Sequence, residues 1–218
     1  MPEPSIPPPS QRLIKEYLHR WNQSKDFKKY RIHEASLVSL FELYPENKEI
    51  EHVLLKVSAL NDFYSTNIFD TYSVAKHILE KDIDARLEKC DYSLVNDIAK
   101  IAKSEEKPRI FYSFASKYCS QHQPETYSIF DSFVEKMILH YQETDAFNGN
   151  DFSKSDLKKY ESFIQIVKKF RSSYKLEKYS LKEIDIFLWI AGKEFFPREY
   201  KKNKDAPYSP GGRLIGAK

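Results

Sequence analysis

The sequence predicts an all-α protein, and three observations support this fold class. Apolar residues recur at spacings of three and four from Gln11 to about Phe196 rather than alternating. Few helix-breaking residues interrupt this stretch: Gly149, Gly192, Pro45, Pro108, Pro124 and Pro197. The chain has 218 residues, of which 41% are hydrophobic and 15% aromatic, enough to form a sizeable core.

The periodicity also predicts the individual elements. We expect helices at about 10–22, 31–44, 48–62, 66–80, 91–103, 109–122, 131–143, 153–173 and 180–195. Ser180 and Glu183 form a capping-box pattern at the start of the last helix. The proline-rich residues 1–10 predict an extended, mobile arm, and the glycine-rich residues 205–218 predict a flexible tail. A single domain is expected over 11–204.

Composition excludes several classes of protein. Cys90 and Cys119 are the two cysteines, too few for a disulfide framework or a four-cysteine cluster, and the six histidines lack metal-binding spacing. We therefore expect no metal and no cofactor. Because the sequence has neither a leader pattern nor an apolar stretch of membrane-spanning length, we expect a cytoplasmic protein without a membrane partner.

The charge pattern leaves two interpretations open. The net charge is only +3, but lysine and arginine become frequent towards the C-terminus. They can neutralise phosphates of a nucleic acid, or they can be the solvated faces of amphipathic helices.

The stretch around residues 53–80 places polar residues between two apolar helices. Asn61, Ser65, Thr66 and Asn67 interrupt the apolar pattern before it resumes at Ile68. One interpretation is a helix–turn–helix corner with a helix N-cap at Ser65, Thr66 or Asn67. The other is a group of polar side chains that faces a ligand.

Lys117 and Asp131 lie on either side of the proline-broken linker in SFASKYCSQHQPETYSIFDSFVEKM. Asp131 precedes an apolar helix and is expected at its start, where the helix dipole stabilises a carboxylate. Ser132 and Glu135 form a competing capping box, which leaves Asp131 freer to face elsewhere. Lys117 has small and apolar neighbours, so partial desolvation would make it a better nucleophile. A structural or solvent-facing lysine is the alternative.

The same segment resembles the helix-hairpin-helix DNA glycosylase superfamily. Its members share a hairpin of the form GVGxKTA followed, one helix later, by D-T-H-V or D-G-N-V. Here SFASKYC corresponds to the hairpin, with Lys117 at its lysine, and IFDSFVEKM corresponds to the aspartate segment, with Asp131 at its aspartate. The resemblance covers about residues 51–141. It departs from the family pattern because serines and an alanine replace the hairpin glycines, so the hairpin is degenerate.

The resemblance implies a fold of two helical lobes with a cleft, and a partner, DNA that contains a damaged or modified base. Asp131 would stabilise the cationic sugar, and Lys117 would form a Schiff base and nick the strand, or contact phosphate if it stays protonated. Asn61, with Tyr64 as second choice, would fill the gap left by the extruded nucleotide. Ser113 and Ser116 of the hairpin region, His122 and Trp189 complete the expected contacts to DNA or base. The enzyme would act in repair or in defence against foreign DNA, as a monomer and, in a bacterium, at the nucleoid.

Two other functions are compatible with these residues. The missing hairpin glycines favour a catalytically inactive helical module that binds DNA or another partner on the same scaffold. The near-neutral net charge favours a helical regulator unrelated to nucleic acid.

Overall fold

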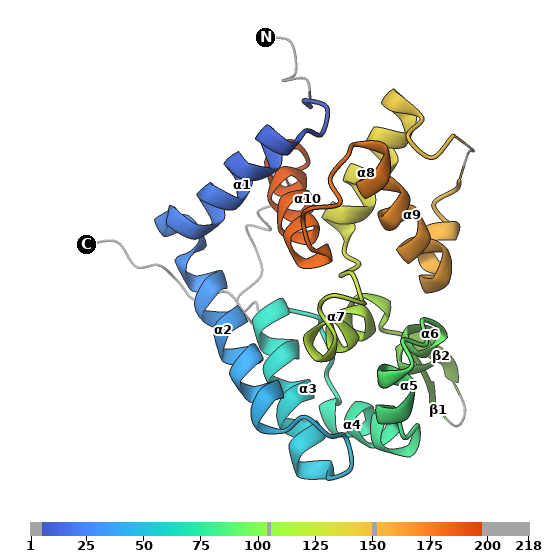
Figure 1. Ribbon diagram of the computed structural model, residues 1–218. Coiled ribbons are helices and arrows are strands. Elements are labelled where there is room, and N and C mark those ends of the chain that lie inside the picture. The colour runs from blue at the N-terminus through green and yellow to red at the C-terminus, as the bar shows by residue number, and fades with distance from the viewer. Residues whose placement is uncertain (1–5, 104–105, 150–151, 198–218) are drawn as a thin grey trace, which may run out of the picture.

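The computed structural model describes residues 6–103, 106–149 and 152–197, which are mostly helical (Figure 1). Its α-helices are α1 (Gln11–Gln23), α2 (Lys28–Leu43), α3 (Ile50–Tyr64), α4 (Thr71–Glu80), α5 (Asp84–Glu88), α6 (Ser93–Ala99), α7 (Tyr112–His122), α8 (Ser132–Asp145), α9 (Tyr160–Ser173) and α10 (Leu181–Phe195). Short 3₁₀ helices lie at Lys25–Phe27 and Asp156–Lys158, and two strands are β1 (Lys100–Lys103) and β2 (Glu106–Ile110). The tail predicted at 205–218 and the first five residues of the predicted arm lie outside the described residues.

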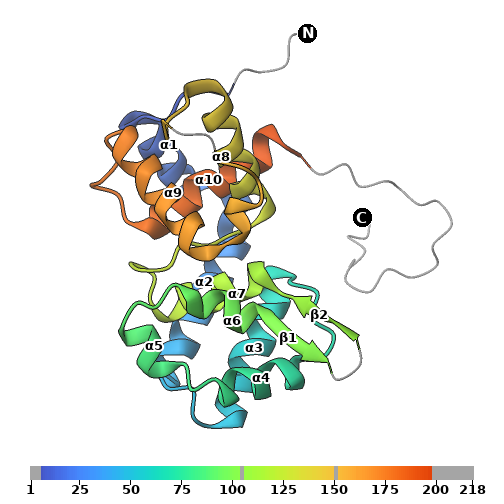
Figure 2. The same ribbon diagram turned by 90° about the vertical axis from the view of Figure 1, so that its right-hand side faces the viewer.

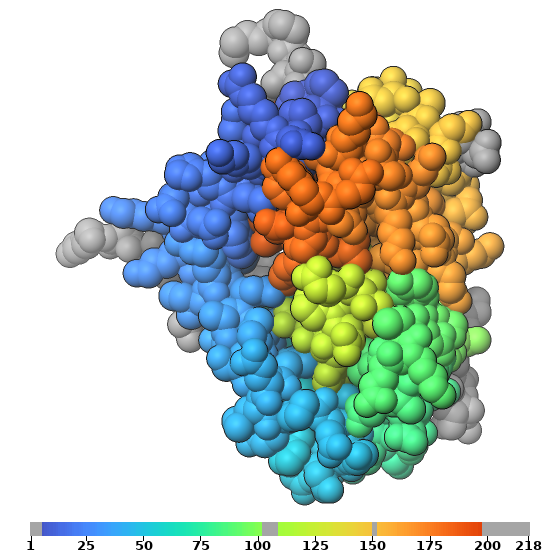
Figure 3. Space-filling view, in the orientation of Figure 1, coloured from blue at the N-terminus to red at the C-terminus, as the bar shows by residue number. Residues whose placement is uncertain are grey.

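The helices form two halves, which Figure 2 shows one above the other. The upper half contains α1, α8, α9 and α10, and α10 packs against both α1 and α8. The lower half contains α3 to α7 and the strands, with α3 packed on α4 and α6 on α7. Segments near α7 and near α10 adjoin on the face drawn in Figure 3, so the two halves are in contact there.

Helix α10 is the central element of the upper half. Its start is the capping box that the sequence predicts: Ser180 Oγ accepts a hydrogen bond from the Glu183 amide, and the Glu183 carboxylate accepts one from the Ser180 amide. Gly192 brings α10 very close to α8, because a Cβ built at this position would lie 2.6 Å from Cβ of Phe133. The position therefore excludes any side chain.

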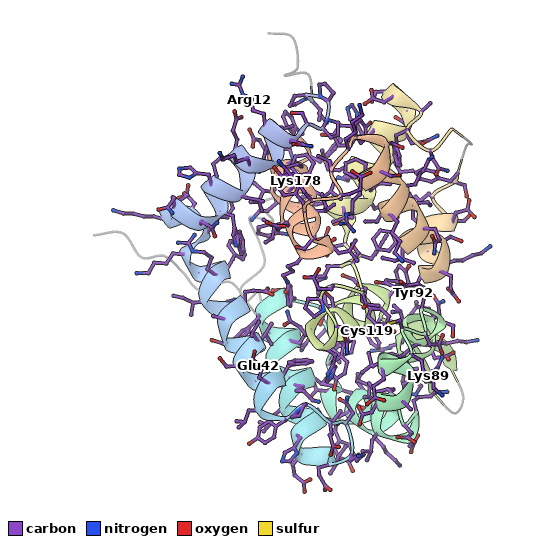
Figure 4. All side chains as sticks on the ribbon, viewed as in Figure 1. Arg12, Glu42, Lys89, Tyr92, Cys119 and Lys178 are labelled. Carbon is purple, nitrogen blue, oxygen red and sulfur yellow. The ribbon has the colours of Figure 1, made fainter. Side chains whose placement is uncertain are left out.

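Tyrosines connect the two halves on the α6–α9 side. Tyr92, labelled in Figure 4, makes an edge contact with Tyr127, and its hydroxyl accepts a hydrogen bond of 2.8 Å from Lys168 of α9. Tyr160 of α9 donates a 2.8 Å hydrogen bond to the Ser128 carbonyl. Tyr160 is fully buried, and a buried tyrosine hydroxyl needs such a partner, which here comes from a different element.

The strands are a departure from the predicted helix at 91–103. The helix ends at Ala99, and β1 pairs antiparallel with β2, with Lys100 opposite Ile110 and Ile101 opposite Arg109. Ile101 continues the helical spacing from Ile98, which is why the pattern predicts a longer helix. A proline at position 108 is compatible with a strand of a two-stranded ribbon but not with a helix interior.

The α3–α4 corner also differs in detail from its prediction. Helix α4 begins at Thr71 rather than at 66, and its N-cap is Asp70, whose carboxylate accepts a hydrogen bond from the Ser73 amide. Ser65 is instead the left-handed residue that ends α3. None of the three predicted N-cap residues is thus the cap of α4.

Residues 6–10 are not free of the core, in contrast to the mobile arm that their prolines predict. Ile6 packs against the core, and the Pro7 carbonyl accepts a hydrogen bond of 3.1 Å from the Tyr141 hydroxyl. Ser10 then caps α1 by accepting a hydrogen bond from the Leu13 amide. These contacts tie the start of α1 to α8.

Candidate functional site

A cavity of about 720 Å³ lies where α2 and α3 meet the starts of α8 and α10. This volume falls within the range of about 300–1,000 Å³ that is usual for small-molecule sites. Its wall is formed by Trp21, Tyr30, His33, Glu34, Phe63, Tyr64, Ser65, Thr66, Asn67, Ser113, Lys117, Ile129, Phe130, Asp131, Ser132, Phe133, Val134, Lys182, Asp185, Ile186, Trp189, Lys193 and Pro197. Lys117 and Asp131 thus line one cavity, and Tyr64, Ser113 and Trp189 line it with them.

Lys117 reaches the cavity from α7. Its side chain is only 5% exposed, and Nζ donates hydrogen bonds to the hydroxyl and the carbonyl oxygen of Ser113, one turn earlier in the helix. Nζ also lies 5.3 Å from the centre of the Tyr64 ring, a cation–π distance. These contacts hold a mostly buried amine at the cavity wall.

Asp131 is the N-cap of α8, which corrects the prediction that Ser132 and Glu135 form the capping box. Oδ1 of Asp131 accepts hydrogen bonds from the amides of Phe133 (2.8 Å) and Val134 (2.9 Å). Both bonds use Oδ1 and neither uses Oδ2. These two bonds fix the orientation of the carboxylate at the cavity wall.

Asp185 is a buried carboxyl group of the cavity wall that the sequence pattern does not single out. It lies on α10, is 4% exposed, and accepts hydrogen bonds from Ser128 Oγ and from the Ile129 amide (2.7 Å). Burial raises the pKa of Asp185 to about 7 and the nearby Asp131 adds to the rise, while the two hydrogen bonds and Lys182 oppose it. The cavity therefore contains a carboxyl group that titrates close to neutral pH.

Glu34 and Lys182 form an ion pair across the cavity, from α2 to α10. The Glu34 carboxylate also accepts hydrogen bonds from the Tyr64 hydroxyl (2.7 Å) and from Gln121 Nε2 (3.2 Å). Burial opposes the ionisation of Glu34, but the lysine and these donors outweigh it and lower its pKa. Burial in turn raises the pKa of Tyr64 well above its ordinary value, so its hydroxyl stays a hydrogen-bond donor.

Aromatic rings form one side of the cavity. Trp189 makes edge contacts with Trp21 and Tyr30, with centroid distances of 6.2 Å and 4.9 Å. Lys193 Nζ lies over the rings of Trp189 and Tyr30, at 4.4 Å and 4.6 Å from their centres. His33 stacks on Phe63, and its buried Nδ1 has no hydrogen-bond partner within the described residues. Flat rings with a few polar atoms suit a planar, heteroaromatic ligand.

Three of the predicted contact residues do not line the cavity. Asn61 stabilises the α3–α4 corner, since its side chain bonds to the amide (2.9 Å) and the carbonyl (3.0 Å) of Ile68. Ser116 is fully buried, and its Oγ accepts a 3.0 Å hydrogen bond from the Phe130 amide. His122 lies in the lower half, 3.2 Å from the side-chain amide of Asn47, and burial lowers its pKa to about 3.

Metal-binding clusters and membrane-spanning helices are both absent from the described part of the chain. No group of three or more histidine, cysteine, aspartate or glutamate side chains there is arranged to hold a metal ion. Within the same residues, none of the helices combines the length and apolar character needed to cross a membrane.

Comparison with known proteins gives the family of the chain. The family model HI_0787_N, described as an N-terminal domain, matches residues 13–126. The chain belongs to the HI_0787_N family. The match includes Tyr64, Ser113 and Lys117, whereas Asp131 and Asp185 lie beyond it. A protein of Haemophilus influenzae that carries the name "uncharacterized protein" is 42% identical over 150 residues, which are 68% of this chain and 70% of the relative. No solved structure matched the chain.

Proposed function

We propose that this protein is a DNA glycosylase that removes a damaged or modified base. The observation that carries the proposal is that Lys117 and Asp131, on two different helices, line one cavity with an aromatic wall. A base inside the duplex stack cannot be reached, so a glycosylase must bind an extruded nucleotide in such a cavity. Stacking on Trp189 or Tyr30 would hold the base.

Asp131 has the simplest role in this mechanism. When the bond between C1′ and the base nitrogen breaks, the electron pair of that bond leaves with the base, which takes up a proton. The sugar is left with a positive charge. A carboxylate fixed beside that carbon stabilises the positive charge most strongly where water is excluded. Oδ1 is occupied by the two amide bonds, so Oδ2 is the oxygen that would face the sugar.

Lys117 would act as the nucleophile. Its amine must first lose a proton; it then adds to C1′ as the base departs, and the ring oxygen takes a proton when the sugar ring opens to a Schiff base. Elimination of the 3′ phosphate from this intermediate would nick the strand. The hydrogen bonds to Ser113 hold the amine in place before substrate binds. A lysine that remained protonated would instead bind phosphate.

Base release and strand nicking can be tested separately. Base release is tested with duplexes that each carry one 8-oxoguanine, hypoxanthine, uracil or 7-methylguanine. Schiff-base formation is tested with borohydride and a duplex that carries one abasic site, so the result does not depend on which base the protein recognises. We expect Lys117→Ala to abolish borohydride trapping, while Lys168→Ala, on the outer side of α9, leaves it unchanged.

The role of Asp131 has a closely matched control. Asn caps helices about as well as Asp, so Asp131→Asn keeps α8 but removes the charge. We expect base release to fall at least about 100-fold. Asp70→Asn makes the same change at the N-cap of α4, away from the cavity, and should have no effect. Binding of the duplexes without release or trapping would support the inactive DNA-binding module instead.

A further inference from the structure

The segment 128–131 carries Asp131 into the cavity, and its polar groups are held by side chains from three helices. Tyr160 of α9 donates to the Ser128 carbonyl, at 2.8 Å. Ser116 of α7 accepts from the Phe130 amide, at 3.0 Å. The remaining contacts come from α10, through Asp185. The segment has no regular structure of its own, so these side chains determine its path.

Asp185 bonds to two consecutive residues of this segment. Its carboxyl oxygens accept from Ser128 Oγ and from the Ile129 amide, and Ser128 is 0% exposed. A buried amide without a partner is unfavourable, so loss of the carboxyl group would favour a different path for the segment. Asp131 lies two residues further on, and any shift at Ile129 moves its backbone.

We infer that Asp185 is the positioning residue for Asp131: from α10 it fixes the segment 128–131 and thereby the place of the Asp131 carboxylate in the cavity. The catalytic meaning of this role rests on the proposed function, whereas the positioning itself does not. The alternative is that Asp185, which also lines the cavity, contacts the substrate directly.

The charges around Asp185 give the inference a pH-dependent readout. Lys182 on its own helix, Asp131 at the start of α8, Tyr64 on α3 and Tyr160 on α9 interact with it electrostatically. The two tyrosines stay neutral because burial raises their pKa values well above 10. Asp185 is thus the member of this group whose charge changes near neutral pH.

The test compares three full-length variants with the wild type. Asp185→Asn keeps an acceptor for the Ile129 amide but loses the charge, Asp185→Ala loses both bonds, and Ser128→Ala loses one. Hydrogen exchange of amides 129–134 should rise about tenfold or more in Asp185→Ala and less in the other two. Asp84→Asn, which changes a carboxylate that bonds to Asn47 in the lower half, should leave these amides unchanged.

Steady-state base release from the fastest duplex of the panel, measured over a range of duplex concentrations, gives the second readout. Displacement of a catalytic group lowers kcat about 100-fold. We therefore expect kcat of Asp185→Ala to fall about 100-fold with KM nearly unchanged. The kcat of Asp185→Asn should be at least about tenfold higher than that of Asp185→Ala. The pH profile of the wild type should show a step near 7 that is absent in Asp185→Asn.

Two results would overturn the inference. Unchanged exchange at 129–134 in Asp185→Ala would show that the carboxyl group does not fix the segment. An effect on KM with kcat unchanged would make Asp185 a substrate contact. If the wild type releases no base from any duplex, the proposed function fails, but the exchange data still decide whether Asp185 positions the segment.

Discussion

Asn61 and Phe69 lie near the two ends of the α3–α4 corner, and the sequence predicts Asn61, with Tyr64 as second choice, as the residue that fills the gap beside an extruded nucleotide. The Asn61 side chain bonds to both backbone groups of Ile68 and to the Thr66 hydroxyl, so it holds the corner together. Phe69 is 89% exposed and follows Asn67, which lines the cavity. Apolar side chains exposed in this way can insert into a base stack. Phe69 is therefore the better candidate for filling the gap beside an extruded nucleotide.

Substitution of these two residues should give opposite effects. We expect Phe69→Ser to slow base release from duplex DNA about tenfold, because an inserted ring would offset part of the cost of unstacking the extruded base. Release from single-stranded DNA should change little, since no stacked duplex has to be opened. Asn61→Ala should lower the free energy of unfolding by about 1–3 kcal/mol and leave release by the folded protein unchanged.

Tyr72→Ser is the matched control, since Tyr72 is also exposed, at 59%, but lies within α4, further along the chain from the cavity-lining Asn67. Equal losses on duplex and single-stranded DNA in Phe69→Ser would contradict a gap-filling role. Urea denaturation measures the stability of Asn61→Ala.

At the scale of elements, the contact between α8 and α10 is set by one glycine. A methyl group at Gly192 would overlap Cβ and the carbonyl oxygen of Phe133, at 2.6 Å and 2.9 Å, and neither atom can rotate away. We expect Gly192→Ala to lower the free energy of unfolding by about 1–3 kcal/mol, although alanine is the better helix former. Thermal and urea denaturation measure this, and a gain in stability would show that the two helices separate at little cost.

The same substitution should also affect the site. Phe133 follows Asp131 by two residues and donates its amide to the Asp131 carboxylate, so pushing Phe133 aside moves the N-cap. Base release by Gly192→Ala should therefore fall even under conditions where the protein is fully folded.

Most helices could be predicted from the sequence because their apolar residues repeat with helical spacing and face one core. For α10 both the capping box and the extent were evident. The apolar pattern gave a wrong prediction at Ile101, which continues the helical spacing of α6 but lies in β1. It gave no prediction of α5, because a helix of five residues is too short to produce a periodic signal. The start of α4 was misplaced because several residues of the corner are equally good caps, and only packing selects Asp70.

At the scale of the whole molecule, the cavity combines residues of α1, α2, α3, α7, α8 and α10. Lys117 and Asp131 could be proposed from the sequence because both lie in one short stretch that resembles a known family. Asp185 could not, because its partners are 56 and 57 residues away in the chain and an aspartate on an apolar helix has no local pattern that marks it. The Glu34–Lys182 pair was missed for the same reason.

The two halves also carry ionisable groups with opposite effects on global stability. Asp185 keeps its proton in the folded state up to about pH 7 but loses it near 3.8 when unfolded, so between these values its contribution to stability falls as pH rises. His122 is neutral in the folded state down to about pH 3 but gains a proton below about 6.5 when unfolded, so over that range its contribution rises with pH. The two contributions oppose each other from about pH 4 to 6.5.

Single substitutions should therefore reveal slopes of opposite sign. Relative to the wild type, Asp185→Asn should become more stable as pH rises from 4 to 7, by up to about 4 kcal/mol for a pKa difference of three units. The free energy of unfolding of His122→Gln, relative to that of the wild type, should increase as pH falls over the same range. Urea denaturation at several pH values measures both differences, and the other carboxylates cancel because each comparison is with the wild type. Difference profiles that stay flat would mean that neither group is held in its uncharged form, and the near-neutral titration assigned to the cavity would have to be abandoned with them.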